Sequence, residues 1–280
     1  MSRVWLITGC SSGFGRLLAK EALKSGARVA ATGRRVETLE AWSEERPDNL
    51  LRLSCDVTRG EEIRLAAART VEHFGRIDVL VNNAGYGYFA TQEEGDIDDI
   101  RRMFETNVFG LVRMTQAVLP VMRRQRSGVI VNLSSIAGRV AFPRSGFYNA
   151  TKFAVEGLSE SLYYEVAPFG IRVIVIEPGA YETDFGPRSA VRSAALSDPN
   201  SPYAELVARW TEAVARIFPA KRQDPAEVVA GILKAVAGDA AFVRIPFGVD
   251  AVPFVRQRET MSDAEFMQMM REQYGFGAPL

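Results

Sequence analysis

Short apolar runs alternate with segments of helical periodicity along most of the chain. The runs span five or six residues and are rich in valine, leucine and isoleucine, which is typical of strands buried on both faces. They lie at residues 3–7, 28–32, 50–55, 77–81, 128–133, 171–176 and 242–246. Because helix-length segments separate them, the pattern predicts an α/β fold: a doubly wound parallel sheet of about seven strands with helices on both faces.

The length of the chain, 280 residues, favours a single domain over residues 1–280, because α/β sheets of this size often remain one unit with an ample core. No stretch has the composition of a linker. Residues 186–222 contain prolines and short helical patterns but no further predicted strand, and residues 250–280 form a C-terminal extension. We therefore expect one domain with two segments that do not belong to its sheet.

The first predicted strand leads directly into a glycine-rich turn and then into a helical pattern. The turn, residues 8–15, reads Thr-Gly-Cys-Ser-Ser-Gly-Phe-Gly. Glycines let a backbone turn tightly and approach a pyrophosphate, while the N–H groups and dipole of the following helix favour an anion. In this context the turn predicts a dinucleotide-binding site.

Tyr148 and Lys152 are spaced by one helical turn, so they share a helix face. A phenol with a pKa near ~10 is a poor acid or base at neutral pH, and a neighbouring cation stabilises its anion. The pair alone favours a solvated helix face. However, the polar loop after the predicted strand at 128–133 places Ser135 thirteen residues before Tyr148, and this context favours a proton-transfer site.

With these motifs in this order, the chain resembles the classical short-chain dehydrogenase/reductase family over roughly residues 3 to 250. The resemblance implies a Rossmann fold and hydride transfer between a nicotinamide and a carbonyl or secondary alcohol. The matching segments beyond the glycine turn and the Tyr-x-x-x-Lys pair are Asn82-Asn83-Ala84-Gly85, Asn107, and Pro178-Gly179 with Thr183.

The resemblance also implies a role for each candidate catalytic residue. Ser135 would polarise the substrate oxygen, Tyr148 would transfer the proton, and Lys152 would stabilise the tyrosinate and bind the nicotinamide ribose. Asn107 would hold a water that links Lys152 to solvent; considered by itself, its sequence favours a buried structural asparagine. Ser134 competes with Ser135, but the spacing to Tyr148 favours Ser135.

The cofactor-binding residues implied in the same way surround the turn and the later loops. They are Thr8, Gly9, Ser11, Ser12, Gly13, Phe14, Gly15, Arg34, Asp56, Val57, Asn83, Ala84, Gly85, Tyr148, Lys152, Pro178, Gly179 and Thr183. Asp56 would face the adenine ring, although a turn or helix-capping aspartate fits its local sequence as well.

The end of the second predicted strand bears on which nicotinamide cofactor is used. An acidic residue there binds a ribose 2′-hydroxyl, whereas an arginine accommodates a 2′-phosphate. Gly33 stands at the discriminating position and Arg34 follows it, so NADP(H) is favoured and NAD(H) remains possible. One departure is Ser12, because many NADP(H)-dependent members carry a basic residue just before the second glycine.

Composition excludes several other classes of protein. Lysine plus arginine and aspartate plus glutamate number 34 each, without a basic cluster, which disfavours nucleic acid as a partner. Neither a membrane span nor a leader segment is indicated, so a cytoplasmic enzyme without a membrane partner is expected. His73, Cys10 and Cys55 do not form a metal-ligand pattern, and a Ser-His-Asp triad lacks a plausible base.

The substrate is predicted only in outline. Aromatic residues beside the motif loops suggest a fairly apolar alcohol or ketone, although any of them could be core: Tyr86, Tyr88, Phe142, Phe147, Tyr181 and Phe185. Residues 186–222 follow the nicotinamide loop and are expected to form a substrate lid. The resemblance further implies a homodimer or homotetramer.

Two alternatives remain at this point. A non-catalytic regulator on the same fold would bind NADPH without turnover, but it would be expected to have lost Tyr148 or Lys152. Epimerases and dehydratases of the extended family share the Tyr-x-x-x-Lys pair, but they usually have a longer C-terminal domain and a different glycine spacing.

Overall fold

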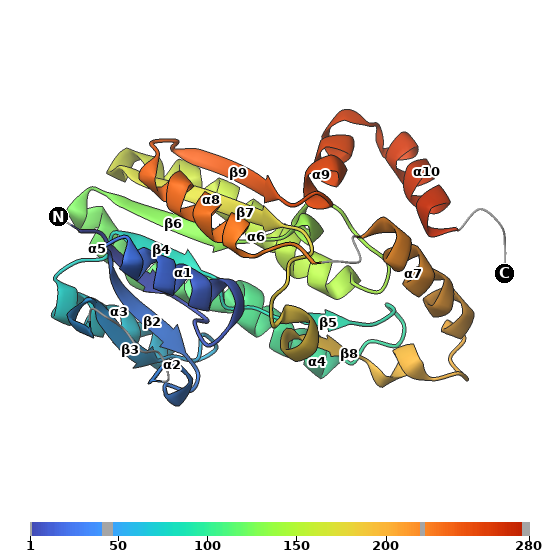
Figure 1. The fold of residues 1–280 in the computed structure, drawn as a ribbon, viewed down its shortest axis with the longest axis horizontal. Helices are drawn as coiled ribbons and strands as arrows, with labels where there is room; N and C mark the ends of the chain where they lie inside the picture. The colour runs from blue at the N-terminus through green and yellow to red at the C-terminus, as the bar shows by residue number, and fades with distance from the viewer. Residues whose placement is uncertain (1, 41–46, 219–221, 276–280) are drawn as a thin grey trace.

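The computed structural model describes residues 2–40, 47–218 and 222–275, and a single parallel sheet forms its centre (Figure 1). Within these residues the sheet has seven strands, and every pairing between them is parallel. Their spatial order is β3 (Leu50–Ser54), β2 (Arg28–Gly33), β1 (Val4–Ile7), β4 (Val79–Asn82), β6 (Gly128–Leu133), β7 (Ile171–Pro178) and β9 (Phe242–Phe247). The predicted fold class is confirmed.

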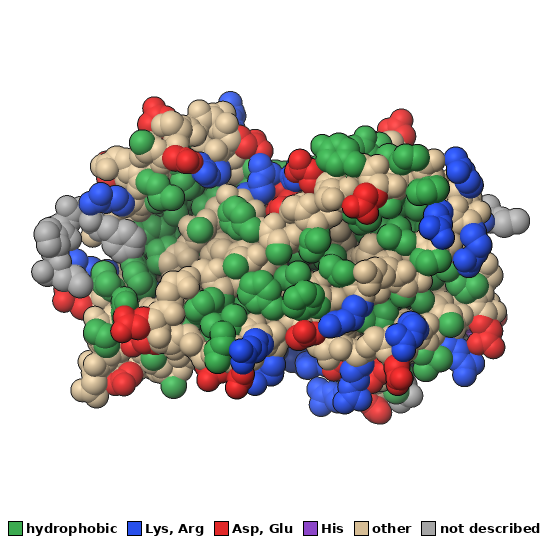
Figure 2. Space-filling model, turned by 180° about the vertical axis from the view of Figure 1, so that it is seen from behind, with side chains coloured by type: hydrophobic (Ala, Val, Ile, Leu, Met, Phe, Trp, Pro, Cys, Tyr) green, Lys and Arg blue, Asp and Glu red, His purple; other side chains and the backbone are tan. Residues whose placement is uncertain are grey.

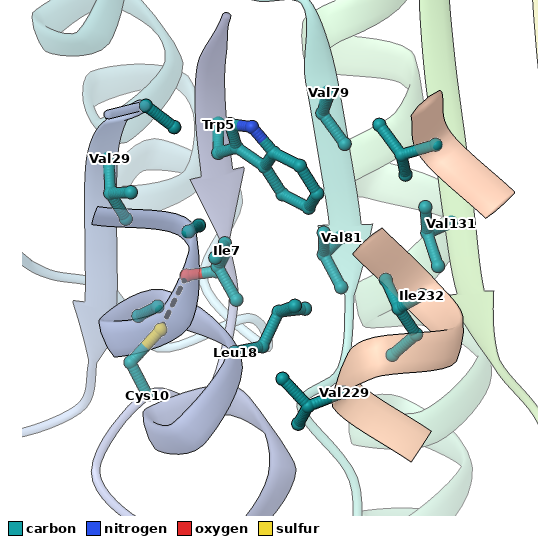
Figure 3. Close-up of a cluster of buried hydrophobic side chains, with 14 of the residues drawn as sticks. Trp5, Ile7, Cys10, Leu18, Val29, Val79, Val81, Val131, Val229 and Ile232 are labelled. Atoms are coloured by element: carbon teal, nitrogen blue, oxygen red, sulfur yellow. Dashed lines mark hydrogen bonds between the residues drawn. The ribbon is translucent and has the colours of Figure 1, made fainter. Parts of the chain in front are cut away.

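The strands coincide with the apolar runs because helices cover both faces of this sheet. Along β1, Trp5 and Ile7 pack into the cluster on one face, while Val4 and Leu6 pack into the cluster on the other. Successive strand residues point to opposite faces, so a strand between two helical layers needs an unbroken apolar run. Figure 3 shows the first cluster, in which Leu18 of α1 lies near Ile7 and Trp5 lies farther along β1.

The helices form a layer on each face of the sheet (Figure 1). The face lined by Trp5 and Ile7 is covered by α1 (Gly13–Lys24), α2 (Glu37–Glu40) and α8 (Ala226–Ala237). The opposite face is covered by α3 (Gly60–Phe74), α5 (Gly110–Gln125) and α6 (Gly146–Val166). Short helical turns, numbered η1 to η6, lie at Pro47–Asn49, Glu105–Phe109, Ile136–Gly138, Ala167–Phe169, Phe185–Ser189 and Ala194–Ser197.

A smaller unit lies beyond the carboxyl ends of the central strands. The helices α7 (Ala204–Ile217), α9 (Ala251–Thr260) and α10 (Asp263–Tyr274) pack together around Phe254, Phe266 and Tyr274 (Figure 1). This cluster includes Ile136 and Val140, which follow Ser135. The C-terminal extension therefore supports the loop that carries the candidate serine.

The expectation that residues 186–222 contain no strand is wrong. The segment β8 (Ala190–Arg192) pairs in parallel with β5 (Gly87–Phe89), near α4 (Ile97–Phe104), in a separate two-stranded sheet. A three-residue strand that includes an arginine has too short an apolar pattern to be recognised. The pairing fastens the start of the predicted lid to the loop after β4.

The helices α3 and α6, with the turn η2, carry exposed apolar side chains, and green side chains gather on the face shown in Figure 2. Phe109, Phe153 and Tyr164 expose 47%, 47% and 66% of their surface. Scattered exposed apolar residues are normal on a monomer, whereas a contiguous group suits a contact with another protein.

Among the described residues, no helix is both long enough and apolar enough to cross a membrane.

Candidate active site

A cleft of about 1480 Å³ opens at the carboxyl edge of the sheet. It lies where the strand order reverses between β1 and β4, the place at which doubly wound sheets bind nucleotides. Nearly all predicted site residues line it, whereas Thr8, Gly15 and Asn107 lie behind its wall. A smaller hollow of about 340 Å³ at the opposite edge, beside Arg3, contains none of them.

The glycine turn has the backbone conformation that its sequence predicts. Gly9 and Gly13 have φ angles of 71° and 56°, in the left-handed region that glycine favours. A Cβ on Gly15 would lie 2.4 Å from Nδ2 of Asn83 and 2.5 Å from the carbonyl oxygen of Gly9. Because Gly15 has no side chain, the start of α1 can lie close to the backbone of Gly9. This leaves the N-terminus of α1 open for a phosphate.

Thr8 and Asn83 hold this turn to the loop after β4. The Thr8 hydroxyl oxygen accepts hydrogen bonds from the backbone N–H groups of Asn83 (2.9 Å) and Ala84 (3.0 Å). In return, Nδ2 of Asn83 donates to the carbonyl oxygens of Thr8 (2.8 Å) and Gly9 (3.1 Å). Thr8 thus holds the glycine turn and the loop after β4 in a fixed relative position.

Ser135, Tyr148 and Lys152 meet in one buried group on the cleft wall. The Ser135 hydroxyl accepts from the N–H of Ala137 (3.1 Å), donates to the carbonyl of Pro178 (3.3 Å) and contacts Tyr148. The Lys152 ammonium nitrogen lies 5.7 Å from the centroid of the Tyr148 ring. Ser134 also lines the cleft, and its buried hydroxyl has no partner among the described residues.

Burial dominates the acidity of both groups in the unliganded protein. It raises the pKa of Tyr148 to about 12, although the hydrogen bond with Ser135 acts in the opposite direction. It lowers the pKa of Lys152 to about 8, and the Glu156 carboxylate partly offsets this. Burial penalises the tyrosinate and the ammonium alike, so each charge becomes more favourable when the other is present.

Asn107 joins the loop after β4 to α6, the helix that carries Tyr148 and Lys152. It lies in η2, where the helix between α4 and α5 widens to a π-type turn. Its side chain accepts from the N–H of Tyr86 (3.0 Å) and donates to the Tyr86 carbonyl (2.7 Å) and to Thr151 (3.1 Å). Widened turns of this kind often occur at functional sites. The Lys152 ammonium instead donates to the carbonyl of Leu133, at 2.7 Å.

Arg34 and Asp56 lie at the end of the cleft reached from β2 and β3. Arg34 is exposed, and its guanidinium forms no ion pair within the described part of the chain. Asp56 accepts hydrogen bonds from the N–H (2.9 Å) and hydroxyl (2.8 Å) of Thr58. Asp56 is therefore a turn aspartate that also lines the cleft, and its role toward an adenine ring stays a prediction.

The loop after β7 closes the other side of the cleft and depends on the C-terminal extension. Asp250 accepts from the N–H of Ala180 (2.7 Å), and a Cβ on Gly179 would lie 2.1 Å from its carboxylate. Thr183 approaches Gly13 across the cleft, where a Cβ on that glycine would meet Thr183 at 3.7 Å. Only glycine at position 179 leaves room for this arrangement.

Two of the six aromatic residues expected in the pocket are placed wrongly by the sequence analysis. Tyr88 is fully buried and its hydroxyl accepts from the N–H of Asp96, while Phe147 packs beside it at a ring separation of 6.3 Å. Neither lines the cleft. Phe89 lines it instead, with its ring 5.9 Å from that of Tyr148. Tyr86, Phe142, Tyr181 and Phe185 do line it.

A buried ion network lies next to the group of Ser135, Tyr148 and Lys152, and no sequence motif indicated it. Glu177, the next-to-last residue of β7, accepts from Arg139 (3.0 Å), and Arg244 lies 4.0 Å away. Arg244 also donates to Glu156 (2.9 Å), four residues after Lys152. One oxygen each of Glu156 and Glu177 is buried without a partner among the described residues. Burial and the Glu156 charge raise the pKa of Glu177 to about 7, against the opposing effect of the arginines.

This shift predicts how stability depends on pH. An unfolded glutamate titrates near its ordinary value of ~4.3, so between that value and about 7 the native protein holds one more proton than the unfolded chain. Stability should therefore fall as pH rises from 5 to 7.5, by on the order of 1 to 3 kcal/mol from this group. We expect Glu177→Gln to flatten the fall, as measured by urea unfolding at several pH values.

The matched control for this prediction is Glu160→Gln, because Glu160 pairs with Arg244 from an exposed position. Its dependence of unfolding free energy on pH should match that of the wild type. A slope that Glu177→Gln leaves unchanged would show that Glu177 does not titrate in this range.

Neither cysteine nor histidine chemistry competes with this site. Cys10 and Cys55 are free and buried, and burial raises the pKa of each thiol to about 12. Both are therefore small buried residues of the core. His73 is exposed near the end of α3, and no group of three or more potential metal ligands occurs in the residues described.

The fold, the glycine turn and the buried serine, tyrosine and lysine define a dinucleotide-dependent oxidoreductase. The family model described as short chain dehydrogenase matches residues 3–191, and the chain belongs to that family. It is accordingly an enzyme of the class that interconverts alcohols and carbonyl compounds with a nicotinamide cofactor.

Individual relatives agree over nearly the full length. The oxidoreductase BOA17 of Botryotinia fuckeliana (strain B05.10) is 36% identical over 258 residues, 91% of this chain and 92% of the relative. A short-chain dehydrogenase structure from Streptomyces avermitilis is 40% identical, with a TM-score of 0.84 over 100% of this chain and 99% of that one. Another, from Burkholderia cenocepacia J2315 in complex with NADP, is 26% identical, with a TM-score of 0.74 over 99% and 98%.

Proposed function

We propose that this enzyme transfers a hydride between NADP(H) and a carbonyl or secondary alcohol, with Tyr148 as the general acid or base. The observation that carries the proposal is the burial of Ser135, Tyr148 and Lys152 in one group on the wall of the cleft that also contains the glycine turn. A proton-transfer group next to a dinucleotide site is the arrangement that this chemistry requires.

Ser135, Tyr148 and Lys152 each have a separate role in this reaction. A bound nicotinamide supplies or accepts the hydride. During reduction, Ser135 donates a hydrogen bond to the substrate oxygen and Tyr148 gives that oxygen its proton. Lys152, 5.7 Å from the Tyr148 ring, stabilises the tyrosinate that remains. During oxidation the same groups act in reverse, with Tyr148 as the base.

The test is NADPH consumption with a panel of ketones, aldehydes and quinones, followed by absorbance. Turnover of any carbonyl compound supports the proposal. Saturable NADPH binding without turnover across the whole panel would favour the alternative, a non-catalytic regulator. Retention of Ser135, Tyr148 and Lys152 argues against that alternative, because a regulator has no need of a proton-transfer group.

The preference for NADP(H) rests on Arg34. Its exposed guanidinium beside the cleft has no ion-pair partner in the described residues, so it can bind a 2′-phosphate. Loss of a hydrogen bond to a charged group costs about 1.5–3 kcal/mol. We therefore expect Arg34→Ala to lower kcat/KM for NADPH by roughly 10- to 100-fold while changing that for NADH little.

Arg35→Ala is the matched control, since Arg35 is the adjacent exposed arginine but does not line the cleft. The double change Gly33→Asp, Arg34→Ala should move the preference toward NADH, because a carboxylate accepts ribose hydroxyls and repels a phosphate. The atoms nearest to a Cβ on Gly33 belong to Leu39, at an ordinary 3.7 Å, so the backbone tolerates a Cβ at this position. An NADPH/NADH ratio that Arg34→Ala leaves unaltered would refute this assignment.

We also propose that residues 186–222 act as the substrate lid and that the enzyme self-associates. Leu196, Val214 and Phe218 line the cleft from this segment, and residues 219–221 lie outside those described. The pairing of β8 with β5 would restrict movement at the start of the lid. A homodimer or homotetramer remains a prediction; the exposed apolar residues of α6 and of the turn η2 suit such an assembly.

A further inference from the structure

Two arginines stand at the part of the cleft next to Tyr148. Arg144 precedes α6 by two residues, and Arg192 ends β8; both line the cleft. Arg192 pairs with Phe89 in the β5–β8 register, so their side chains share a face of that ribbon. Because the Phe89 ring lies 5.9 Å from the ring of Tyr148, this face looks toward the candidate catalytic tyrosine.

The backbone fixes both arginines to the same short segment. The N–H of Ala90 donates to the carbonyl of Arg144 at 2.9 Å, and the N–H of Ser193 donates to the carbonyl of Phe89 at 2.9 Å. Phe89 and Ala90 thus lie between the two arginines. The arrangement does not depend on the position of a long flexible loop.

Neither guanidinium has a carboxylate partner in the described residues. Arg144 donates to the hydroxyl of Thr211 (3.1 Å), and both burial and the charge of Arg192 lower its pKa. The nearby Glu94 is engaged elsewhere, because its carboxylate accepts from the hydroxyls of Thr91 and Ser201. By contrast, Arg101 and Arg102, which also line the cleft, each pair with an acidic residue.

Arg144 also has a backbone conformation that disfavours a side chain. Its φ angle is 65°, and only one other non-glycine residue, Arg126, has a positive φ within the described chain. Such a conformation costs free energy at a residue with a Cβ and is concentrated at functional sites. A strained, partly buried arginine within electrostatic range of a second arginine is more stable when an anion binds to both.

We propose that Arg144 and Arg192 bind an anionic oxygen group, a carboxylate or a phosphate monoester, at the end of the substrate remote from its carbonyl. The inference rests on the proposed function and narrows its substrate class. Phe185, whose ring is 5.6 Å from that of Tyr148, and Phe142 line the same cleft and suit an apolar segment between the two ends. The substrate is therefore an oxo acid or oxo phosphate with an apolar middle, rather than an uncharged ketone.

The experiment compares straight-chain oxo acids of four to ten carbons, and the corresponding oxo-alkyl phosphates, with the methyl esters of the same acids. We expect kcat/KM for the best anionic compound to be at least tenfold higher than kcat/KM for the corresponding methyl ester. Whether that compound is a carboxylate or a phosphate identifies the anionic group that the two arginines bind. Arg192→Gln and Arg144→Gln should each reduce this ratio toward one and leave the KM for NADPH unchanged.

Arg209→Gln is the control, because Arg209 lies on α7, pairs with Glu205 and does not line the cleft. Arg192 is exposed, so Arg192→Gln keeps the test decisive if Arg144→Gln fails to fold. Esters reduced as well as the acids and phosphates, or ratios unchanged by Arg192→Gln, would overturn the inference.

A binding measurement separates this inference from the proposed function. Calorimetry of the NADP-saturated protein with decanoate and with decyl phosphate needs no turnover. Binding of either compound that Arg192→Gln abolishes supports the anion site even if no carbonyl compound is reduced. Absence of binding in the wild type contradicts the site even if uncharged ketones are good substrates.

Discussion

Replacing Tyr148 with phenylalanine is expected to lower kcat by about 10²- to 10⁴-fold while leaving NADPH binding close to that of the wild type. The phenylalanine ring can keep the contacts of Tyr148 with Phe89 and Phe185, at ring separations of 5.9 and 5.6 Å. Only the hydroxyl that transfers the proton is removed. Steady-state rates with the best carbonyl substrate give kcat, and fluorescence titration gives the dissociation constant of NADPH.

Tyr88→Phe provides a matched control for this change. Tyr88 is a second buried tyrosine of the same apolar cluster, but its hydroxyl accepts from the N–H of Asp96 and does not face the cleft. Its loss should reduce stability slightly and kcat very little. A Tyr148→Phe enzyme that retains near wild-type kcat would exclude Tyr148 as the general acid, whatever its position.

The sheet was predictable from the sequence because a strand that is buried on both faces requires a continuous apolar run. The apolar run at 128–133 has the same bounds as β6, and Arg28–Gly33 exceeds the predicted strand by one residue. The glycine turn was predictable for a related reason, since positive φ angles at Gly9 and Gly13 restrict which residues fit. In both cases a local physical requirement limits the choice of residue.

Contacts between segments that are distant in the sequence produce no comparable local pattern of residues. Tyr88 and Phe89 are adjacent aromatics of β5, yet one is buried and the other lines the cleft, because strand neighbours point in opposite directions. Deciding which faces the cleft requires the β5–β8 pairing, whose strands lie about a hundred residues apart. The pairing of Arg139 with Glu177 depends in the same way on the folded structure.

The second large effect is expected for Lys152→Met, which preserves much of the side-chain volume but removes the charge. The Lys152 ammonium is buried, donates to the carbonyl of Leu133 at 2.7 Å and lies 5.7 Å from the Tyr148 ring. Since burial raises the pKa of Tyr148 to about 12, the tyrosinate depends on a nearby cation. Loss of that cation should lower kcat by about 10²-fold or more.

The pH profile distinguishes this electrostatic role from a structural one. Burial lowers the pKa of Lys152 to about 8 in the free protein, so its positive charge is present below that pH and is lost above it. Because kcat/KM for NADPH reports the free enzyme, this quantity should fall in the wild type as pH rises through about 8. Lys152→Arg keeps a charge that does not titrate in this range and should retain part of the activity without the alkaline fall. If Lys152→Met keeps the alkaline fall, or if Lys152→Arg behaves like Lys152→Met, the charge of Lys152 is not what the reaction uses.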